Sequence, residues 1–391
     1  MTEKRKSPAL RFRGYTDDWE QRKLGDIFEE YSEKDHAELP ALTIIQGGGT
    51  IRRDESDRAL QYDKKSLSNY KKVDVGDFIV HLRSFEGGLE MATNTGIVSP
   101  AYHIFHGEKV DSRFYYSYFR SKQFINTDLK PHVYGIRDGR SIDIEGMKTI
   151  EIPWTILDEQ KAIGNCIDTL DRLITLHQRK LEKLKLVKKS MLEKMFPKNG
   201  SSVPEIRFKG FTDDWEQRKF NDIATRESAV RKSSPDCPSI EYEDVVAEAG
   251  ILNKDIRLKD SEKNGIIFDG SQVLYGKLRP YLHNWHNPDF EGVAVGDWWV
   301  LKPIHVDKSF LYRLIQTQKF DDIANQSSGS KMPRADWNLV SNSEFSIPPL
   351  IDEQVRIGTY FNDLDNLITL HQRKVEKLKI LKKSMLEKMF V

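Results

Sequence analysis

Two segments of the chain combine basic side chains with Gly and Ser, and their residue types suit the binding of an anion. They read YGIRDGRS at 134–141 and SSGSKMPRADW at 327–337. Gly lets the backbone come close to a phosphate, and Arg or Lys can bind a phosphate or donate two hydrogen bonds to guanine. An ordinary surface charge is the alternative for each basic residue. These loops are candidate binding segments, and the elements that hold them decide what they can reach.

No complete catalytic motif accompanies these loops. The run NPDF at 287–290 resembles the NPP-aromatic tetrad of adenine methyltransferases, but Asp289 stands where the second Pro belongs and no Gly-rich cofactor motif is present. The run GGG at 47–49 lacks the strand and helix context of a nucleotide-binding loop and is expected to be a turn. There is no Walker A sequence, and the two cysteines, Cys166 and Cys237, predict neither a disulfide framework nor a metal site. A catalytic triad scattered through the fold stays open.

Two long segments with one shared pattern are expected to position the loops. In 163–196 and in 357–390, mainly apolar residues recur at alternating steps of three and four, which is the a/d pattern of a coiled-coil seam over about four heptads. A helix of this length spans roughly 50 Å. The simplest arrangement buries the two stripes against each other, within one chain or between two. The predicted seam residues are Ile167, Leu170, Ile174, His177, Leu181, Leu184, Lys188, Met191 and Met195, and in the copy Phe361, Leu364, Ile368, His371, Val375, Leu378, Lys382, Met385 and Met389.

The helices belong to a larger repeat. From Leu173 to Phe196 the two copies differ at only three aligned positions, and the segment TDDWEQRK occurs at both 16–23 and 212–219. A period near 195 residues indicates tandem duplication of a whole domain with its helix. Trp19 and Trp215, within this segment, are expected to anchor it by packing, and Thr16 or Asp17 could cap a short helix there.

The stretches between the repeated parts, 24–155 and 220–350, hardly match each other. Alternating apolar residues predict half-buried strands at Phe78, Val80 and Leu82 and again at Val273 and Tyr275. Helical patterns follow at 114–125 and 310–323, and an Ile-Pro strand closes each stretch at 150–154 and 345–350. The predicted class is α+β.

The composition limits the class of protein. A chain of 391 residues suits two or three domains, and 38% hydrophobic residues are enough to build their cores. The net charge of +1 provides no overall field for a polyanion. Residues 177–198 carry eight Lys or Arg against two Glu, which is interpreted as a solvated helix face rather than a DNA contact. No apolar run approaches membrane length and no export signal is recognisable, so the cytoplasm is the expected location.

The order of these parts resembles that of the DNA-specificity subunit of a type I restriction–modification enzyme, over essentially the whole chain. The motifs that carry the resemblance are the repeated DDWEQRK segments, the runs LRSFEGG, GIVSPAY and YGKLRPYL, and two exits of the form IP-x-L-x-DEQ-x-x-I at 152–163 and 347–357, the first with one extra residue. Any one of these motifs is weak. Together, in order and in duplicate, they are specific.

The resemblance implies that each variable domain is a target-recognition domain for one half of a bipartite, asymmetric site in double-stranded DNA. The helices would form an antiparallel coiled coil that sets the gap, and they would also hold two methyltransferase subunits, through which restriction/translocase subunits join. The chain itself would be non-catalytic and hold no cofactor. S-adenosylmethionine, ATP and Mg would belong to the partner subunits, and no membrane would be involved.

The implied organisation is two tandem globular recognition domains, two long helices and a pseudo-twofold internal repeat. The expected boundaries are 1–155 for the first recognition domain, 156–198 for the first helix, 199–350 for the linker and second recognition domain, and 351–391 for the second helix. Polar seam residues fit a role in fixing the register of the helices. Metal binding by His177 and His371 is the weaker alternative, because no Cys or carboxylate stands at ligand spacing.

The Gly-flanked loops and the basic runs before them are the expected DNA-facing residues. The candidates are Arg83, Ser84, Gly87, Arg137 and Arg140 in the first domain, and Lys277, Arg279, Tyr281, Ser330, Lys331 and Arg334 in the second. For any one residue, phosphate contact is expected more often than base contact. The run 279–281 is alternatively a structural turn around Pro280, and Phe85, Trp298 and Trp299 are expected in the cores.

Two other classes of function stay open. One is a DNA-modifying enzyme with divergent motifs, which would bind a cofactor or metal as a purified chain. The other is a coiled-coil scaffold, whose affinity for DNA would show no sequence preference and little dependence on salt.

Overall fold

The structure, a computed structural model, describes residues 7–56, 64–80, 89–134, 141–198, 200–259, 262–326 and 332–390. The chain divides into two compact units. The first comprises Met1–His177 with Lys374–Val391, and the second comprises Gln178–Arg373. Two long helices, α4 (Leu157–Lys194) and α9 (Ile351–Met389), each contribute one part to each unit.

The first unit is built around an antiparallel sheet of order β2-β9-β6-β7, and its first and last strands, β1 and β12, form a separate pair. The remaining strand pairs are β3-β4, β5-β8 and β10-β11. Its elements before α4 are β1 (Glu20–Lys23), α1 (Leu24–Ile27), β2 (Glu29–Tyr31), β3 (Leu42–Ile45), β4 (Gly49–Arg52), η1 (Arg53–Glu55), η2 (Lys64–Asn69), β5 (Lys71–Val73), β6 (Phe78–Val80), β7 (Glu90–Met91), β8 (Gly96–Val98), β9 (His103–His106), α2 (Ser112–Phe119), η4 (Phe124–Asp128), η5 (Lys130–His132), β10 (Val133–Tyr134), β11 (Ser141–Ile142), α3 (Ile144–Lys148) and β12 (Glu151–Trp154).

The second unit has two four-stranded sheets, ordered β14-β21-β18-β19 and β15-β17-β20-β16, and the strand pair β13-β22. Only β16 and β20 pair in parallel among its described strands. Its elements before α9 are β13 (Glu216–Lys219), α5 (Phe220–Ile223), β14 (Ala224–Glu227), β15 (Val230–Lys232), β16 (Ser239–Ile240), η7 (Tyr242–Asp244), η8 (Ile256–Leu258), β17 (Asn264–Phe268), β18 (Val273–Gly276), η9 (Pro280–Leu282), β19 (Trp285–His286), β20 (Gly292–Ala294), β21 (Trp298–Pro303), α6 (Lys308–Leu314), α7 (Gln318–Ala324), α8 (Trp337–Asn342) and β22 (Glu344–Ile347).

The prediction of half-buried strands is wrong for β6 and β18, because both strands are buried on both faces. In β6, Phe78 and Val80 belong to one hydrophobic cluster and Ile79 belongs to another. In β18, Val273 and Tyr275 likewise face one cluster while Leu274 faces a second. The alternation of side chains therefore separates two cores rather than a core from solvent. The predicted α+β class itself is confirmed.

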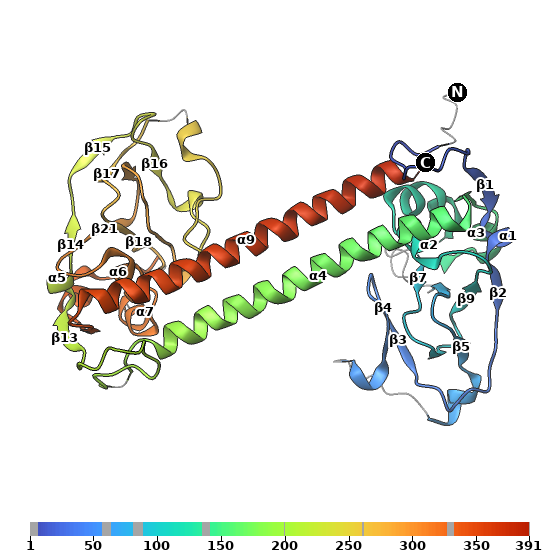
Figure 1. Cartoon of the computed structure of the whole chain (residues 1–391), viewed down its shortest axis with the longest axis horizontal. Helices are drawn as coiled ribbons and strands as arrows, with labels where there is room; N and C mark the ends of the chain where they lie inside the picture. The colour runs from blue at the N-terminus through green and yellow to red at the C-terminus, as the bar shows by residue number, and fades with distance from the viewer. Residues whose placement is uncertain are drawn as a thin grey trace. The chain divides into compact units, whose positions relative to one another are not determined.

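In each unit, segments of α4 and α9 pack side by side and run antiparallel (Figure 1). In the first unit the beginning of α4 lies beside the end of α9, and the Lys382 ammonium binds the Asp171 carboxylate at 2.6 Å. In the second unit the end of α4 lies beside the beginning of α9, where Lys188 binds Asp365 at 2.6 Å. The helices thus pair within one chain.

The DEQ triplet at the start of each long helix forms a joint with the domain before it. Buried Glu159 accepts two hydrogen bonds from Arg11, at 2.6 and 2.8 Å, and one from Trp19 at 3.0 Å. Burial alone would raise the pKa of Glu159, but these hydrogen bonds outweigh it and lower that pKa. Gln160 accepts the backbone N–H of Asp111 at 3.0 Å. The first turn of α4 is therefore tied by its side chains to the domain that precedes it.

The same joint is repeated in the second unit. Glu353 accepts hydrogen bonds from Arg207 at 2.7 and 2.8 Å and from Trp215 at 3.3 Å. Gln354 accepts the backbone N–H of Asp307 at 2.8 Å. Gly358 lets the two segments approach, because a Cβ there would lie 2.5 Å from Ser309 Cβ. The predicted anchoring role of both tryptophans is confirmed.

Three smaller predictions concern single elements. The segment after Trp19 forms strand β1 rather than a capped helix, and α1 begins only at Leu24. Each predicted helical pattern is divided by a turn, as α6 and α7 show in the second unit. The Ile-Pro strands at 150–154 and 345–350 are present as β12 and β22.

Candidate nucleic-acid interface

The structure places four of the predicted DNA-binding residues, all in the second unit. These are Lys277, Arg279, Tyr281 and Arg334. The others, Arg83, Ser84, Gly87, Arg137, Arg140, Ser330 and Lys331, lie outside the described residues.

The four residues come from two segments that pair with each other. The backbone N–H of Arg279 donates to Pro333 O at 2.7 Å, and that of Ala335 donates to Lys277 O at 2.8 Å. An antiparallel bridge joins Leu278 to Arg334 between them. The basic run after β18 and the end of the second Gly/Ser loop, far apart in sequence, therefore form one edge. We call 277–281 with 333–335 the basic edge.

The basic edge presents cations and an aromatic ring to solvent. Arg279 and Arg334 are exposed, and Tyr281 is 53% exposed. Arg279 has φ 48°, in the left-handed region, and η9 follows it at Pro280. Residues 279–281 therefore form a structural turn and are also part of the exposed basic surface. Arg and Tyr side chains in this setting can contact phosphate oxygens or base edges.

Asp297, which the sequence analysis missed, binds two cations of the edge. Its carboxylate accepts Nε of Arg334 at 3.1 Å and Nη2 at 3.0 Å, and it lies 3.6 Å from Lys277 Nζ. The hydrogen bonds from Arg334 are the main reason why the pKa of Asp297 is lowered, and they raise the pKa of Arg334. No local pattern in the sequence pointed to Asp297, because its contacts join segments that are far apart in the chain.

Tyr242 fixes the backbone beneath this ion pair. Its hydroxyl donates to Asp297 O at 2.7 Å and accepts the N–H of Leu278 at 2.9 Å. The Lys277 N–H donates to the same Asp297 oxygen at 2.9 Å. The ring of Tyr242 packs on Trp298, with centroids 4.7 Å apart. Trp298 and Trp299 are both buried, as predicted, so the basic edge lies next to a buried aromatic core.

The predicted seam residues are all buried or half-buried. Buried among them are Ile167, Leu170, Ile174, Met195, Phe361, Leu364, His371, Val375 and Met389, and half-buried are His177, Leu181, Leu184, Lys188, Met191, Ile368, Leu378, Lys382 and Met385. The two lysines are held by carboxylates of the facing helix. Among the described residues, no group of three His, Cys, Asp or Glu is arranged to hold a metal.

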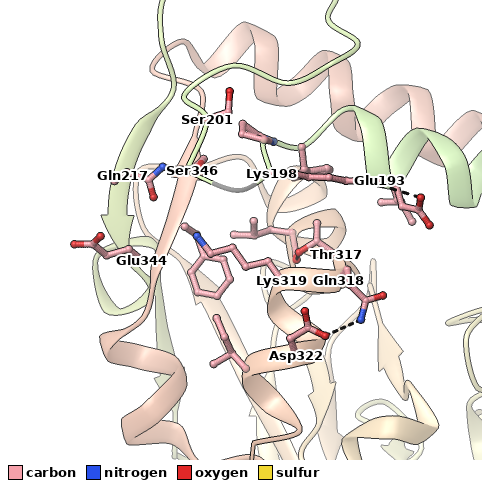
Figure 2. Close-up of a pocket in the computed structure, with 17 residues that line it drawn as sticks. Glu193, Lys198, Ser201, Gln217, Thr317, Gln318, Lys319, Asp322, Glu344 and Ser346 are labelled. Carbon is pink, nitrogen blue, oxygen red and sulfur yellow. Dashed lines mark hydrogen bonds and ion pairs between the residues drawn. The ribbon is translucent and has the colours of Figure 1, made fainter.

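The second unit also contains a cavity of about 800 Å³ at the end of α4 (Figure 2). Lys198, Lys319, Asp322 and Glu344 line it together with apolar side chains, and Gln318 donates to Asp322 at 2.8 Å. None of the four predicted DNA-binding residues that the structure describes lines it. Its mixed lining gives no arrangement for a particular reaction.

The NPDF run is part of the packing of the second unit. Phe290 contacts Phe268 edge-on, with ring centroids 5.7 Å apart. The backbone oxygen of Pro288 accepts a hydrogen bond from Lys308. Within this run, Phe290 and the Pro288 carbonyl therefore have structural contacts.

The sequence matches the family described as type I restriction modification DNA specificity domain twice, over residues 16–186 and 212–379. These matches cover most of the chain, and the chain belongs to this family. The predicted family and the tandem duplication are both confirmed.

Individual relatives agree with this assignment. The type I restriction enzyme MjaVIII specificity subunit of Methanocaldococcus jannaschii is 24% identical over 301 residues, which are 71% of this chain and 68% of that protein. The EcoDI specificity subunit of Escherichia coli is 25% identical over 172 residues, 40% of this chain and 37% of that protein.

A solved structure shares the fold. The crystal structure of the type I restriction–modification S subunit from M. genitalium matches with a TM-score of 0.62 at 13% identity, covering 98% of this chain and 99% of that one. Among the described residues, no helix has the length and apolar character to cross a membrane.

Proposed function

We propose that the chain is the DNA-binding specificity subunit of a type I restriction–modification complex and reads a bipartite, asymmetric site, one recognition domain for each half. The contrast between its repeated and non-repeated parts carries the proposal. From Leu173 to Phe196 the helix differs from its copy at only three positions, whereas 24–155 and 220–350 hardly match. Domains that read two different half-sites must differ, while helices that meet one kind of partner twice must stay alike.

The basic edge supports a role in reading DNA for the second domain. Arg279 and Arg334 are exposed, and Asp297, whose backbone is held by Tyr242, binds Arg334 and Lys277. Fixed donors suit the base edges of a major groove, and additional Lys and Arg contacts to phosphates supply affinity that depends on salt. The candidates of the first domain and those in 327–331 are proposed by analogy with this edge.

The paired helices are proposed to set the gap between the half-sites. With 38 and 39 residues, α4 and α9 each extend about 57 Å at 1.5 Å per residue. One turn of B-DNA measures about 34–36 Å. The helices could therefore hold two domains about one and a half turns apart. The seam residues would fix their register.

Exposed apolar residues on the helices support the docking of two methyltransferase subunits. Three pairs of repeat-equivalent positions carry large exposed side chains, namely Leu173 with Leu367, Leu176 with Leu370, and Leu186 with Ile380. Burial of apolar surface by a partner stabilises the complex by about 25 cal/mol per Å² of area removed from water. Since the two sets are equivalent, they suit two copies of one partner. Restriction/translocase subunits would join through these copies, and the partners would supply S-adenosylmethionine, ATP, Mg and catalysis.

Selection of DNA by the full chain from a random duplex library tests the proposal. The expected result is an enriched motif of two short blocks with a constant gap. The double variant Lys277→Ala/Arg334→Ala should lose only the block that the second domain reads. The control Arg218→Ala/Lys219→Ala, which removes two positive charges from β13 of the same unit, should retain both blocks.

Two other results would favour the alternatives. Binding of DNA without any enriched motif would support the scaffold. Stoichiometric binding of S-adenosylmethionine by the isolated chain, with methyl transfer to DNA, would support a divergent enzyme.

A further inference from the structure

Arg334 has two edges that can donate pairs of hydrogen bonds, and one of them is already used. Nε and Nη2 bind the two carboxylate oxygens of Asp297 at 3.1 and 3.0 Å. The other edge, formed by Nη1 and the second hydrogen of Nη2, makes no hydrogen bond to any residue that the structure describes. The side chain is 53% exposed at this position. A guanidinium held on one side thus presents a second donor pair outward.

Three contacts hold the backbone around Asp297 and Arg334 in place. Tyr242 and the backbone of Lys277 both donate to its carbonyl oxygen, at 2.7 and 2.9 Å. Leu278 bridges to Arg334 itself. The carboxylate and the guanidinium are therefore fixed at both the side-chain and the backbone level. Such support lowers the entropy lost when the outward donors bind a target.

From this arrangement, and resting on the proposed function, we infer that Asp297 is a specificity-determining positioning residue that orients Arg334 to read one guanine in the half-site of the second domain. Guanine presents two acceptors, O6 and N7, at one edge in the major groove, and they match the outward donor pair. A carboxylate in a DNA-binding surface would otherwise only repel phosphates. The bidentate contact gives Asp297 a different role. Its charge lowers the affinity for DNA, but its two hydrogen bonds fix the orientation of Arg334.

The competing interpretation is that Asp297 merely neutralises two cations. The two interpretations predict different effects on discrimination when the carboxylate is removed. With neutralisation alone, Asp297→Asn would free Arg334 and Lys277 to bind phosphates, so affinity would rise for all sequences and discrimination between bases would not change. With positioning, affinity for unrelated DNA would stay or rise, but discrimination at one G·C pair would fall. Discrimination therefore separates the two interpretations.

The test measures binding of the full chain to its selected duplex, to single-base variants of the second half-site and to unrelated DNA, at several salt concentrations. For Arg334→Ala and Asp297→Asn we expect a loss of discrimination of about tenfold or more at the same G·C pair. Arg334→Lys should lose that discrimination while retaining the salt dependence of wild type, because the charge is kept and the paired donors are not. Glu216→Gln, which removes the carboxylate of the exposed Arg218–Glu216 ion pair in β13, serves as the matched control.

The possible outcomes distinguish failure of this inference from failure of the proposed function. If wild type discriminates and Asp297→Asn discriminates equally at every position, the positioning role is overturned. If Arg334→Ala weakens all sequences alike, Arg334 contacts a phosphate and the inference also fails. If wild type itself shows no sequence preference, the proposed function fails first. Circular dichroism and the thermal midpoint of each variant show whether a loss of discrimination is due to unfolding, and Arg334→Lys provides the same readout with minimal structural change.

Discussion

The ammonium of Lys188 in α4 lies 2.6 Å from the carboxylate of Asp365 in α9. The side chain of this lysine is only 13% exposed, and burial lowers its pKa. Asp365 also accepts Nη1 of Arg313 at 2.7 Å, and this arginine of α6 is 1% exposed. One carboxylate therefore joins α4, α9 and the second recognition domain. The repeat-equivalent pair of the first unit, Asp171 with Lys382, has no such third cation among the interactions of the described residues.

Removing the charge of Asp365 should destabilise the second unit strongly. Asp365→Asn leaves two largely buried cations without a carboxylate, and we expect a loss of about 3–5 kcal/mol in the free energy of unfolding. Lys188→Met should cost less, because Asp365 keeps its bond to Arg313. Chemical denaturation with tryptophan fluorescence measures both.

The repeat supplies the matched control for this prediction. Asp171 is 49% exposed and Lys382 is 29% exposed, so Asp171→Asn should cost no more than about 1 kcal/mol. Equal losses for Asp171→Asn and Asp365→Asn would show that burial does not control the strength of the two ion pairs.

Acid should destabilise the second unit through His286. Its Nδ1–H donates to Gly250 O at 2.7 Å, and burial lowers the pKa of the ring from the ordinary value of 6.5. The unfolded chain therefore binds this proton at a higher pH than the folded chain does. Stability rises with pH wherever the unfolded state binds more protons, so it should fall as the pH drops below 6.5 towards the folded pKa.

Thermal unfolding of wild type and His286→Gln, followed from about pH 7.5 to about pH 5.5, checks this linkage. The variant should be less stable at the upper pH and should lose less stability on acidification. Parallel pH profiles for the two proteins would exclude His286 as the titrating group.

The aromatic residue after the last turn of each helix should stabilise the unit in which it lies. Phe196 stacks on Phe310 with centroids 5.5 Å apart, whereas half-buried Phe390 lies 5.2 Å from Phe114. Phe196→Ala should cost about 3–5 kcal/mol, and Phe390→Ala should cost about 0.5–3 kcal/mol. Differential scanning calorimetry should show each loss in a different unit. A control at an exposed helix position, Leu186→Ala, should change the midpoint little.

The sequence predicted the helices well because their pattern is local. Steps of three and four place Ile167, Leu170 and Ile174 on one face, and all three are buried. The fold class followed from the duplication and from short apolar runs. Alternation in β6 was misinterpreted because Ile79 faces a second core, and a strand covered on both faces cannot be distinguished from a half-covered one by its alternate residues alone.

The candidate interface was predicted in part for a similar reason. Lys277 and Arg334 were selected as basic residues of Gly-flanked loops, and the structure brings their segments together. Asp297 was missed, since an acidic residue is an unexpected component of a DNA-facing surface. Its role depends on backbone contacts between 277–279, 297 and 333–335, and no local pattern in the sequence reports such contacts. The same limit applies to Glu159, whose partners Arg11 and Trp19 lie far away in sequence.

A paired deletion in the helices can change the proposed gap without altering either recognition domain. Asp171 and Lys188 are as far apart in α4 as Asp365 and Lys382 are in α9. Removing seven residues between them from each helix therefore leaves the partners of both ion pairs opposite each other. Deleting 181–187 from α4 and 375–381 from α9 retains the heptad phase and shortens the pair by about 10 Å, which corresponds to about three base pairs. Deleting 181–187 alone shifts one helix against the other and serves as the control, with loss of function expected.

Mapping of methylated sites in DNA from cells that express the chain with the proposed methyltransferase subunits measures the gap directly. Wild type should direct methylation to a two-part motif with a constant gap, and the paired deletion should keep both parts while shortening the gap by about three base pairs. An unchanged gap between the same two parts, or a continuous motif in wild type, would contradict the proposal that the paired helices set the distance between two DNA-reading domains.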